Sequence, residues 1–159
     1  MKVEQLMTKE VASCGPDQTL NDAARIMWEH DCGVVPIVDA AGTHRVVGIL
    51  TDRDACMAAY TRGAKLENVR VGDVMSQSVA TCKPSDDLAT VEATLRSAQV
   101  HRLPVVDDAG QLLGVVSLAD IAREAGRETA AKRRAVTPAE IGETLAAIRQ
   151  PRALGAGAA

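Results

Sequence analysis

The chain has 159 residues and a formal net charge of −3. Its hydrophobic content of 47% is typical of a globular protein and excludes a chain that is disordered throughout. The negative charge and the scarcity of aromatic residues, with one Trp, one Tyr and no Phe, argue against a nucleic-acid partner, which needs a basic face or stacking rings.

The chain opens with MKVEQLMTKEV, which is polar and lacks the apolar segment of a signal peptide. No apolar run approaches the length of a membrane span. We therefore expect a cytoplasmic protein without a membrane partner, whose four cysteines are reduced. The cysteines do not form CxxC pairs, and His30 and His44 are isolated, so no metal site is predicted.

The first half of the chain predicts a β-α-β-β-α unit. A short strand at Val11–Ser13 ends at a turn with Pro16, and apolar residues at helical spacing follow between Leu20 and His30. Two β-rich runs, VVPIVD and VVGIL, are joined by a stretch rich in turn formers. A closing helix is predicted to begin near Thr51.

The second half repeats this pattern. After a linker predicted at residues 60–72 come a strand at Val79–Thr81, a helix between Leu88 and Ala98, the runs LPVVD and LGVVS, and a helix near Ser117. A shift of 68 residues aligns the two copies up to the hairpin turn, and a shift of 66 aligns them after it. Matches this regular indicate an internal duplication.

The sequence therefore predicts an α+β fold of two β-α-β-β-α repeats, at residues 1–59 and 73–126. We expect them to pack about a pseudo-twofold axis, because a unit of about 60 residues is marginally stable alone. Residues 127–159 predict a helical extension, with Thr137 as N-cap, Pro138 as first residue and Glu140 closing a capping box. The final RALGAGAA is expected to be a disordered tail.

These motifs, present twice in the same order, resemble the CBS domain pair, also called a Bateman module. The likeness rests on GVVPIVD and HRLPVVD, and on a G-x-x-[ST]-x-x-D motif that ends each hairpin, GILTDRD and GVVSLAD. It covers about Val3 to Ala125. The resemblance implies tandem CBS repeats that regulate another protein, not identified by the sequence. It also implies a homodimer formed through helices, with Trp28 either in the core or on the dimer face.

Each hairpin is followed by a short polar stretch, residues 51–54 and 117–120, which we call the polar step. Each polar step has two interpretations. Thr51 with Asp54, and Ser117 with Asp120, fit capping boxes that need no ligand. The same acids could accept hydrogen bonds from a ribose diol, and the N-terminus of a helix suits a phosphate. In the CBS family the equivalent acid holds ribose and the Thr or Ser lies beside sugar or phosphate, so we expect both roles together.

The resemblance further implies that adenine lies between backbone segments of each repeat, which needs no aromatic ring. The expected ligand is AMP, ADP, ATP or S-adenosylmethionine, and no cofactor is obligatory. The predicted ligand-binding residues are Ser13, Val34, Val35, Pro36, Thr51, Arg53, Asp54, Thr81, His101, Arg102, Leu103, Pro104, Ser117 and Asp120.

The cations that could hold phosphate are divided between the copies. Arg53 belongs to copy one, whereas His101 and Arg102 belong to copy two, and their counterparts are uncharged. We hypothesise that the three converge across the pseudo-twofold cleft. Alternatively, Arg102 is an exposed charge at a strand edge, or pairs with Asp107 or Asp108.

The sequence contains no nucleophile–base set, Walker loop or metal motif, so we do not expect an enzyme. The leading hypothesis is a regulatory module that senses an adenosine-containing ligand. The alternative is an interaction or scaffold protein in which both polar steps are only helix caps. Cys14 and Cys82, at equivalent positions, are expected to be small buried residues and not a redox switch.

Overall fold

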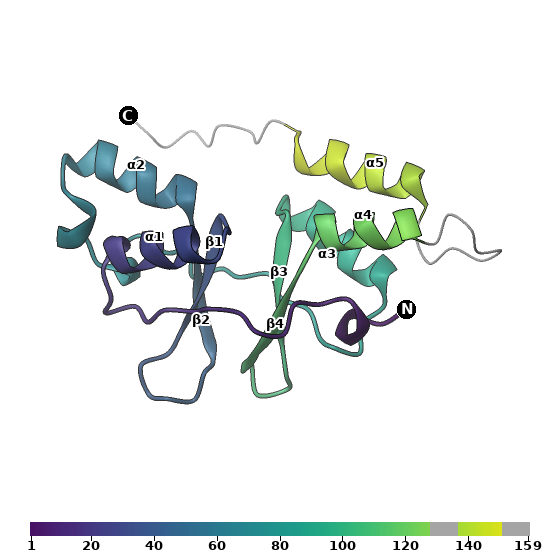
Figure 1. Ribbon diagram of the computed structural model, residues 1–159, viewed down its shortest axis with the longest axis horizontal. Helices are drawn as coiled ribbons and strands as arrows, with labels where there is room; N and C mark the ends of the chain where they lie inside the picture. Colours follow the sequence, from purple (N-terminus) through teal and green to yellow (C-terminus); the bar gives the residue numbers. More distant parts are fainter. Residues whose placement is uncertain (128–136, 151–159) are drawn as a thin grey trace.

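The structure is a computed structural model that describes residues 1–127 and 137–150, so the predicted disordered tail lies outside the described residues. Two similar halves lie side by side, with their hairpins at the centre and their helices outside (Figure 1). Repeat 1 holds α1 (Leu20–Glu29), β1 (Val34–Val38), β2 (Val46–Thr51) and α2 (Asp52–Arg62). Repeat 2 holds α3 (Leu88–Ala98), β3 (Arg102–Val106), β4 (Leu112–Ser117) and α4 (Leu118–Arg127).

The two hairpins are built alike. In each, two antiparallel strands form a two-stranded sheet whose register shifts one pair before the turn. The register sets Val34 opposite Thr51 in repeat 1 and Arg102 opposite Ser117 in repeat 2. The turns also join the repeats, because the Leu112 amide donates to the His44 carbonyl at 2.9 Å. This arrangement confirms the predicted duplicated α+β fold.

The predicted strands at Val11–Ser13 and Val79–Thr81 are wrong. Each segment contributes a single parallel bridge one residue later, Cys14 to Ile37 and Cys82 to Val105. The reason is a proline on the neighbouring strand. The next rung of each ladder would need an amide hydrogen from Pro36 or Pro104, and proline has none.

Each repeat packs against a short segment that precedes the first helix of the other repeat. The η1 turn (Val3–Gln5) packs on repeat 2, where the Val3 amide donates to the Asp86 carbonyl at 3.0 Å. The η3 turn (Val71–Asp73) packs on repeat 1, where the Val71 amide donates to the Gln18 carbonyl at 2.9 Å. A third short turn, η2 (Leu66–Asn68), precedes η3. Figure 1 shows the N-terminal segment running across both hairpins, from repeat 2 to repeat 1.

The exchanged segments lie against two equivalent glycines. A Cβ atom at Gly114 would lie 2.5 Å from the carbonyl oxygen of Thr8, which is backbone. A Cβ atom at Gly48 would first meet the Sδ of Met75, the end of a flexible side chain. We expect Gly114→Ala to destabilise the fold by about 1–3 kcal/mol and Gly48→Ala by less. Urea unfolding of both variants tests this, and equal losses would contradict it.

The core consists of two clusters, one in each repeat. Cys14 is 2% exposed and Cys82 is 4% exposed, and each packs with the aliphatic residues of its cluster. Burial raises the pKa of the Cys14 thiol to about 11 and that of Cys82 to about 12, in each case helped by a nearby aspartate. These thiols stay protonated near neutral pH, which confirms their prediction as apolar core residues.

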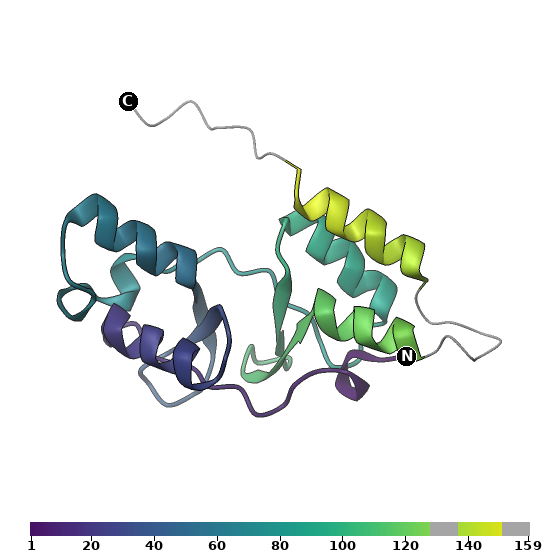
Figure 2. The ribbon, with the colours of Figure 1, turned by 45° about the horizontal axis from the view of Figure 1, so that its top comes forward.

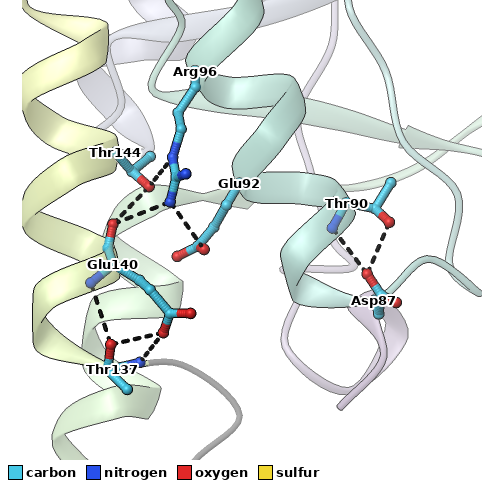
Figure 3. A network of polar contacts seen from close by, with 7 residues as sticks. All are labelled: Asp87, Thr90, Glu92, Arg96, Thr137, Glu140 and Thr144. Atoms are coloured by element: carbon cyan, nitrogen blue, oxygen red, sulfur yellow. Dashed lines mark hydrogen bonds and ion pairs between the residues drawn. The ribbon is translucent and has the colours of Figure 1, made fainter.

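The helix α5 (Pro138–Ile148) follows the repeats, and its predicted start is confirmed. The Thr137 hydroxyl accepts from the Glu140 amide, and the Glu140 carboxylate accepts from the Thr137 amide. Pro138 is the first helical residue. Figure 2 shows α5 lying beside α3 and α4, on the outer side of repeat 2. Arg96 of α3 donates to the Thr144 hydroxyl at 2.8 Å (Figure 3).

Glu92 of α3 is buried under α5 although it carries a carboxyl group. Its Oε1 has no hydrogen-bond partner in the described part of the chain, and its Oε2 lies 3.5 Å from the Arg96 guanidinium. Burial raises the pKa of Glu92 above its usual value of 4.5, with Arg96 opposing and Glu140 and Glu143 adding to the rise. The carboxylate form therefore opposes folding.

A group whose pKa is higher in the folded state makes stability fall as pH rises from its unfolded pKa through its folded pKa. We expect the Glu92→Gln variant to lose this part of the pH dependence. Its melting temperature should change less than that of the wild type from pH 4.5 upwards. Thermal melts across that range measure this, with Glu10→Gln, an exposed residue of the N-terminal segment, as control. An unchanged pH profile would contradict the assignment.

Candidate functional site

The polar steps form the first turns of α2 and α4, and both are capping boxes. In repeat 1 the Thr51 hydroxyl donates to Asp54 Oδ2 at 2.7 Å, and the Asp54 amide donates to the Thr51 hydroxyl at 3.2 Å. In repeat 2 Ser117 and Asp120 make the same contacts at 2.6 and 3.2 Å. Each acid thus uses Oδ2 as a cap, which leaves Oδ1 as the atom that a ligand could reach.

The two Oδ1 atoms differ in their surroundings. Asp54 is half-buried, and its Oδ1 accepts no hydrogen bond from residues 1–127 or 137–150. Asp120 is only 8% exposed, and its Oδ1 pairs with the Arg123 guanidinium one turn along α4. The polar step of repeat 1 therefore keeps an open acceptor, whereas the acid of repeat 2 is already paired within the chain.

Sequence reasoning missed the role of Arg123. The spacing of Asp120 and Arg123, three residues apart at a helix start, is the signal that could have indicated it. The position equivalent to Arg123 in repeat 1 is Met57, which cannot pair with Asp54. A single substitution between the copies thus accounts for the difference between the acids.

The segments at residues 11–13 and 79–81 offer backbone groups at the side of each hairpin. They form no strand, and in the described chain their amides and carbonyls have no backbone partners. Ser13 is half-buried and Thr81 is exposed. Unpaired amides and carbonyls held beside a strand can hydrogen-bond the edge of a planar base.

The strand residues predicted to line the site lie mostly in the core. Val35 and Leu103 are fully buried, Pro36 and Pro104 are buried too, and only Val34 is half-exposed. Side chains of the four buried residues pack inward, so any contact with a ligand has to come from their backbone.

The cations lie at the same edge of each hairpin as the polar steps. Arg53 is exposed in the first turn of α2, His101 is exposed just before β3, and Arg102 is the half-buried first residue of β3. The alternative of an ion pair between Arg102 and the acids after β3 does not hold. Asp108 pairs with Lys83, and Asp107 accepts amides of its own turn.

The charge state of His101 is set by its neighbours. Burial, followed by the guanidinium groups of Arg149 and Arg102, lowers the pKa of His101 below its usual value of 6.5. In the described ranges Arg53, Arg102 and Arg149 form no ion pair, so no acid there offsets these cations. Two unpaired guanidinium groups beside one imidazole, as Arg102 and Arg149 are at His101, suit an anion.

Two cavities lie near the ends of the helices. One, of about 220 Å³, has a polar lining that includes Asp120 and Arg123. The other, of about 590 Å³, lies between α1 and α2 and is lined by Met27, Trp28 and Ala55 among others. Trp28 is 88% exposed and so does not belong to the core, and its place on a dimer face stays a prediction.

Within the described ranges no cluster of His, Cys, Asp and Glu residues could hold a metal ion. The helices of those ranges also fall short of the length and apolarity that a bilayer span requires.

The chain was compared with known proteins. The family model for the CBS domain matches residues 3–60 and 71–127. The CBS domain-containing protein YhcV of Bacillus subtilis is 33% identical over 120 residues, which cover 76% of this chain and 82% of that protein. Other relatives are longer, and the chain spans only 61% and 23% of two of them.

Two solved structures are also similar. A conserved CBS domain protein of unknown function from Thermoplasma acidophilum, TA0289, has a TM-score of 0.77 and 27% identity, covering 94% of this chain and 77% of that one. The CBS domain pair of protein MJ0100, in complex with 5′-methylthioadenosine and S-adenosyl-L-methionine, has a TM-score of 0.71 and 25% identity, covering 81% of this chain and 98% of that one. The duplicated fold, the paired polar steps and these matches together show that the chain belongs to the CBS domain family, as a pair of CBS domains.

Proposed function

We propose that the chain is a regulatory module that binds one adenosine-containing ligand at the polar step of repeat 1. The observation that carries the proposal is Asp54, whose Oδ2 caps α2 while its Oδ1 stays open. A carboxylate oxygen in this position can accept the hydroxyls of a ribose diol. The unpaired backbone of residues 11–13 lies in the same repeat and would receive the base.

A solved relative supports the class of ligand. The MJ0100 pair binds 5′-methylthioadenosine and S-adenosyl-L-methionine, and both contain adenosine. In this chain the cations Arg53, His101 and Arg102 favour a ligand that carries phosphate, because guanidinium groups bind phosphate with charged hydrogen bonds. AMP, ADP or ATP therefore fits the proposal better than S-adenosylmethionine, whose sulfonium is positive.

Ligand binding would regulate a partner protein in the cytoplasm, and no catalysis is proposed. For such regulation the ligand must favour one arrangement of the repeats, or of two chains, over another. The alternative remains a scaffold protein in which both polar steps act only as caps. The pair of Asp120 and Arg123 supports this alternative for repeat 2, because it leaves Asp120 Oδ1 no free position for a ligand.

Thermal melts of the full chain with AMP, ADP, ATP, 5′-methylthioadenosine and S-adenosylmethionine separate the two functions. A ligand present at about 100 times its dissociation constant should stabilise the fold by about 2.7 kcal/mol. We expect at least one of these ligands to raise the melting temperature. No shift with any of the five would overturn the sensor and favour the scaffold.

We also propose a homodimer formed through α1 and α2. Their outer face carries the 590 Å³ hollow, with Trp28 88% exposed and Tyr60 80% exposed. On repeat 2 the equivalent helices α3 and α4 are covered by α5, so in the described part of the chain the face of repeat 1 is the more open to a second copy. The resemblance to CBS pairs, which associate through these helices, favours a second copy as its partner.

The substitution Trp28→Glu should convert this dimer to a monomer, because it sets a charge at the centre of the apolar face. Light scattering after size exclusion measures the mass of each form. Lys9→Glu, an exposed residue outside α1 and α2, is the control and should remain dimeric. A wild-type monomer at all concentrations tested, or a dimer in the Trp28→Glu variant, would contradict the proposal.

A further inference from the structure

The helix α5 lies outside both CBS repeats, yet its C-terminal end reaches the cationic edge of repeat 2. Figures 1 and 2 both show this end beside the start of β3. The side-chain amide of Gln99 donates to the carbonyls of Ala147 and Gln150, at 3.4 and 3.3 Å. Arg149 lies between these two residues in the chain, and His101 and Arg102 follow Gln99 by two and three residues. The contact therefore brings Arg149 to the His101–Arg102 step.

From this arrangement we infer that α5 supplies Arg149 as a second guanidinium group, beside Arg102 and the His101 imidazole, to the anionic end of the ligand, so that docking of α5 and binding of the anion stabilise each other. The inference rests on the proposed function for the adenosine part of the ligand. For the anionic part it rests only on the cluster of Arg149, His101 and Arg102.

The electrostatics of the cluster agree with an anion site. Burial lowers the pKa of His101 most, and Arg149 and Arg102 lower it further, so both guanidinium groups lie close enough to act on this imidazole. No acid within residues 1–127 or 137–150 forms an ion pair with Arg149 or Arg102. The helix end would repel an anion through its carbonyls, but Gln99 occupies two of these carbonyl groups.

The attachment of α5 is suited to such coupling. Ile148 is 7% exposed and Thr144 is fully buried, so the helix is docked, but it lies over the buried carboxyl group of Glu92, whose Oε1 is unpaired. Figure 3 shows Glu92 and Arg96 facing α5. The buried contacts of Ile148 and Thr144 favour docking of α5, and the buried carboxyl group of Glu92 opposes it. One further contact, made through a bound ligand, would therefore shift the docking equilibrium. By linkage, whatever undocks α5 weakens anion binding by the same factor that the anion strengthens docking.

Nuclear magnetic resonance titration of the full chain with inorganic pyrophosphate tests the inference without an adenosine ligand. The three histidines report separately: His101 should shift saturably and its pKa should rise, while His30 and His44 stay unchanged. Arg149→Ala should weaken pyrophosphate binding about 10-fold, as expected for the loss of one charged hydrogen bond. Arg149→Lys should recover part of the affinity, and Arg25→Ala, on α1, should match the wild type.

Hydrogen exchange of α5 gives the second readout. Pyrophosphate or ATP should slow exchange of the α5 amides in the wild type and leave it unchanged in Arg149→Ala. No saturable shift of His101, or equal affinities of the wild type and Arg149→Ala, would overturn the inference. So would unchanged exchange of α5 in the wild type.

The failure of this inference and the failure of the proposed function give different results. If AMP binds through Asp54 with the same affinity in Arg149→Ala, the sensor stands and the role of α5 falls. If pyrophosphate binds at His101 through Arg149 but no adenosine ligand binds more tightly than pyrophosphate, the role of α5 stands and the adenosine sensor falls.

Discussion

Reversing the charge of Arg102, in the variant Arg102→Glu, is expected to weaken the binding of AMP or ATP by about 100-fold. The arginine is the half-buried first residue of β3 and has no ion-pair partner in the described residues, so its guanidinium is available to phosphate. The loss of a hydrogen bond between two charged groups corresponds to roughly 1.5–3 kcal/mol, and the new carboxylate adds repulsion. Isothermal titration calorimetry of the full chain measures the change.

Two variants control this result. Arg102→Lys keeps the charge but not the planar fork and should lie between the wild type and Arg102→Glu. Arg25→Glu reverses a charge on α1, where Arg25 is exposed beside Asp22 and Glu29, and should leave affinity unchanged. Binding of ATP by Arg102→Glu within twofold of the wild type would reject the role of Arg102. Binding of 5′-methylthioadenosine, which has no phosphate, should change much less.

The substitution Asp54→Asn is expected to reduce affinity for every adenosine ligand by about 10-fold or more. It replaces the charged acceptor of the ribose diol with a neutral amide, and hydrogen bonds to charged groups are about twice as strong as neutral ones. The fold should be nearly unaffected, because an asparagine oxygen can still accept from the Thr51 amide and hydroxyl, which now donate at 2.9 and 2.7 Å.

The matched variant is Asp120→Asn in repeat 2. Asp120 already pairs with Arg123, so this change should lower stability slightly and leave ligand affinity as it is. Calorimetry and thermal melts of both variants give the comparison. The reverse pattern, with affinity lost in Asp120→Asn and kept in Asp54→Asn, would mean that repeat 2 holds the ligand.

The local features of this fold could be predicted from the sequence. The duplication, the helices and the capping boxes at Thr51, Ser117 and Thr137 follow from signals within a few residues of each other. The strands at Val11–Ser13 and Val79–Thr81 could not be assigned correctly, because their pairing depends on Pro36 and Pro104 far along the chain.

The candidate site also combines features that could be predicted from the sequence with features that could not. The two polar steps look equivalent in sequence, and their difference arises from Arg123, whose partner depends on how α4 presents it to Asp120. The position of α5 could not be predicted either, because its cap and its apolar residues do not indicate what it packs against. The sequence therefore does not indicate a role for Arg149, which lies beside His101 because of the Gln99 contacts.

The most direct test of the adenosine sensor is a crystal structure of the chain grown with the ligand that gives the largest thermal shift. We predict one ligand per chain, with its ribose hydroxyls on Asp54 Oδ1 and its base against the backbone of residues 11–13. A ligand bound at Asp120 instead, or electron density at neither acid under saturating conditions, would contradict it.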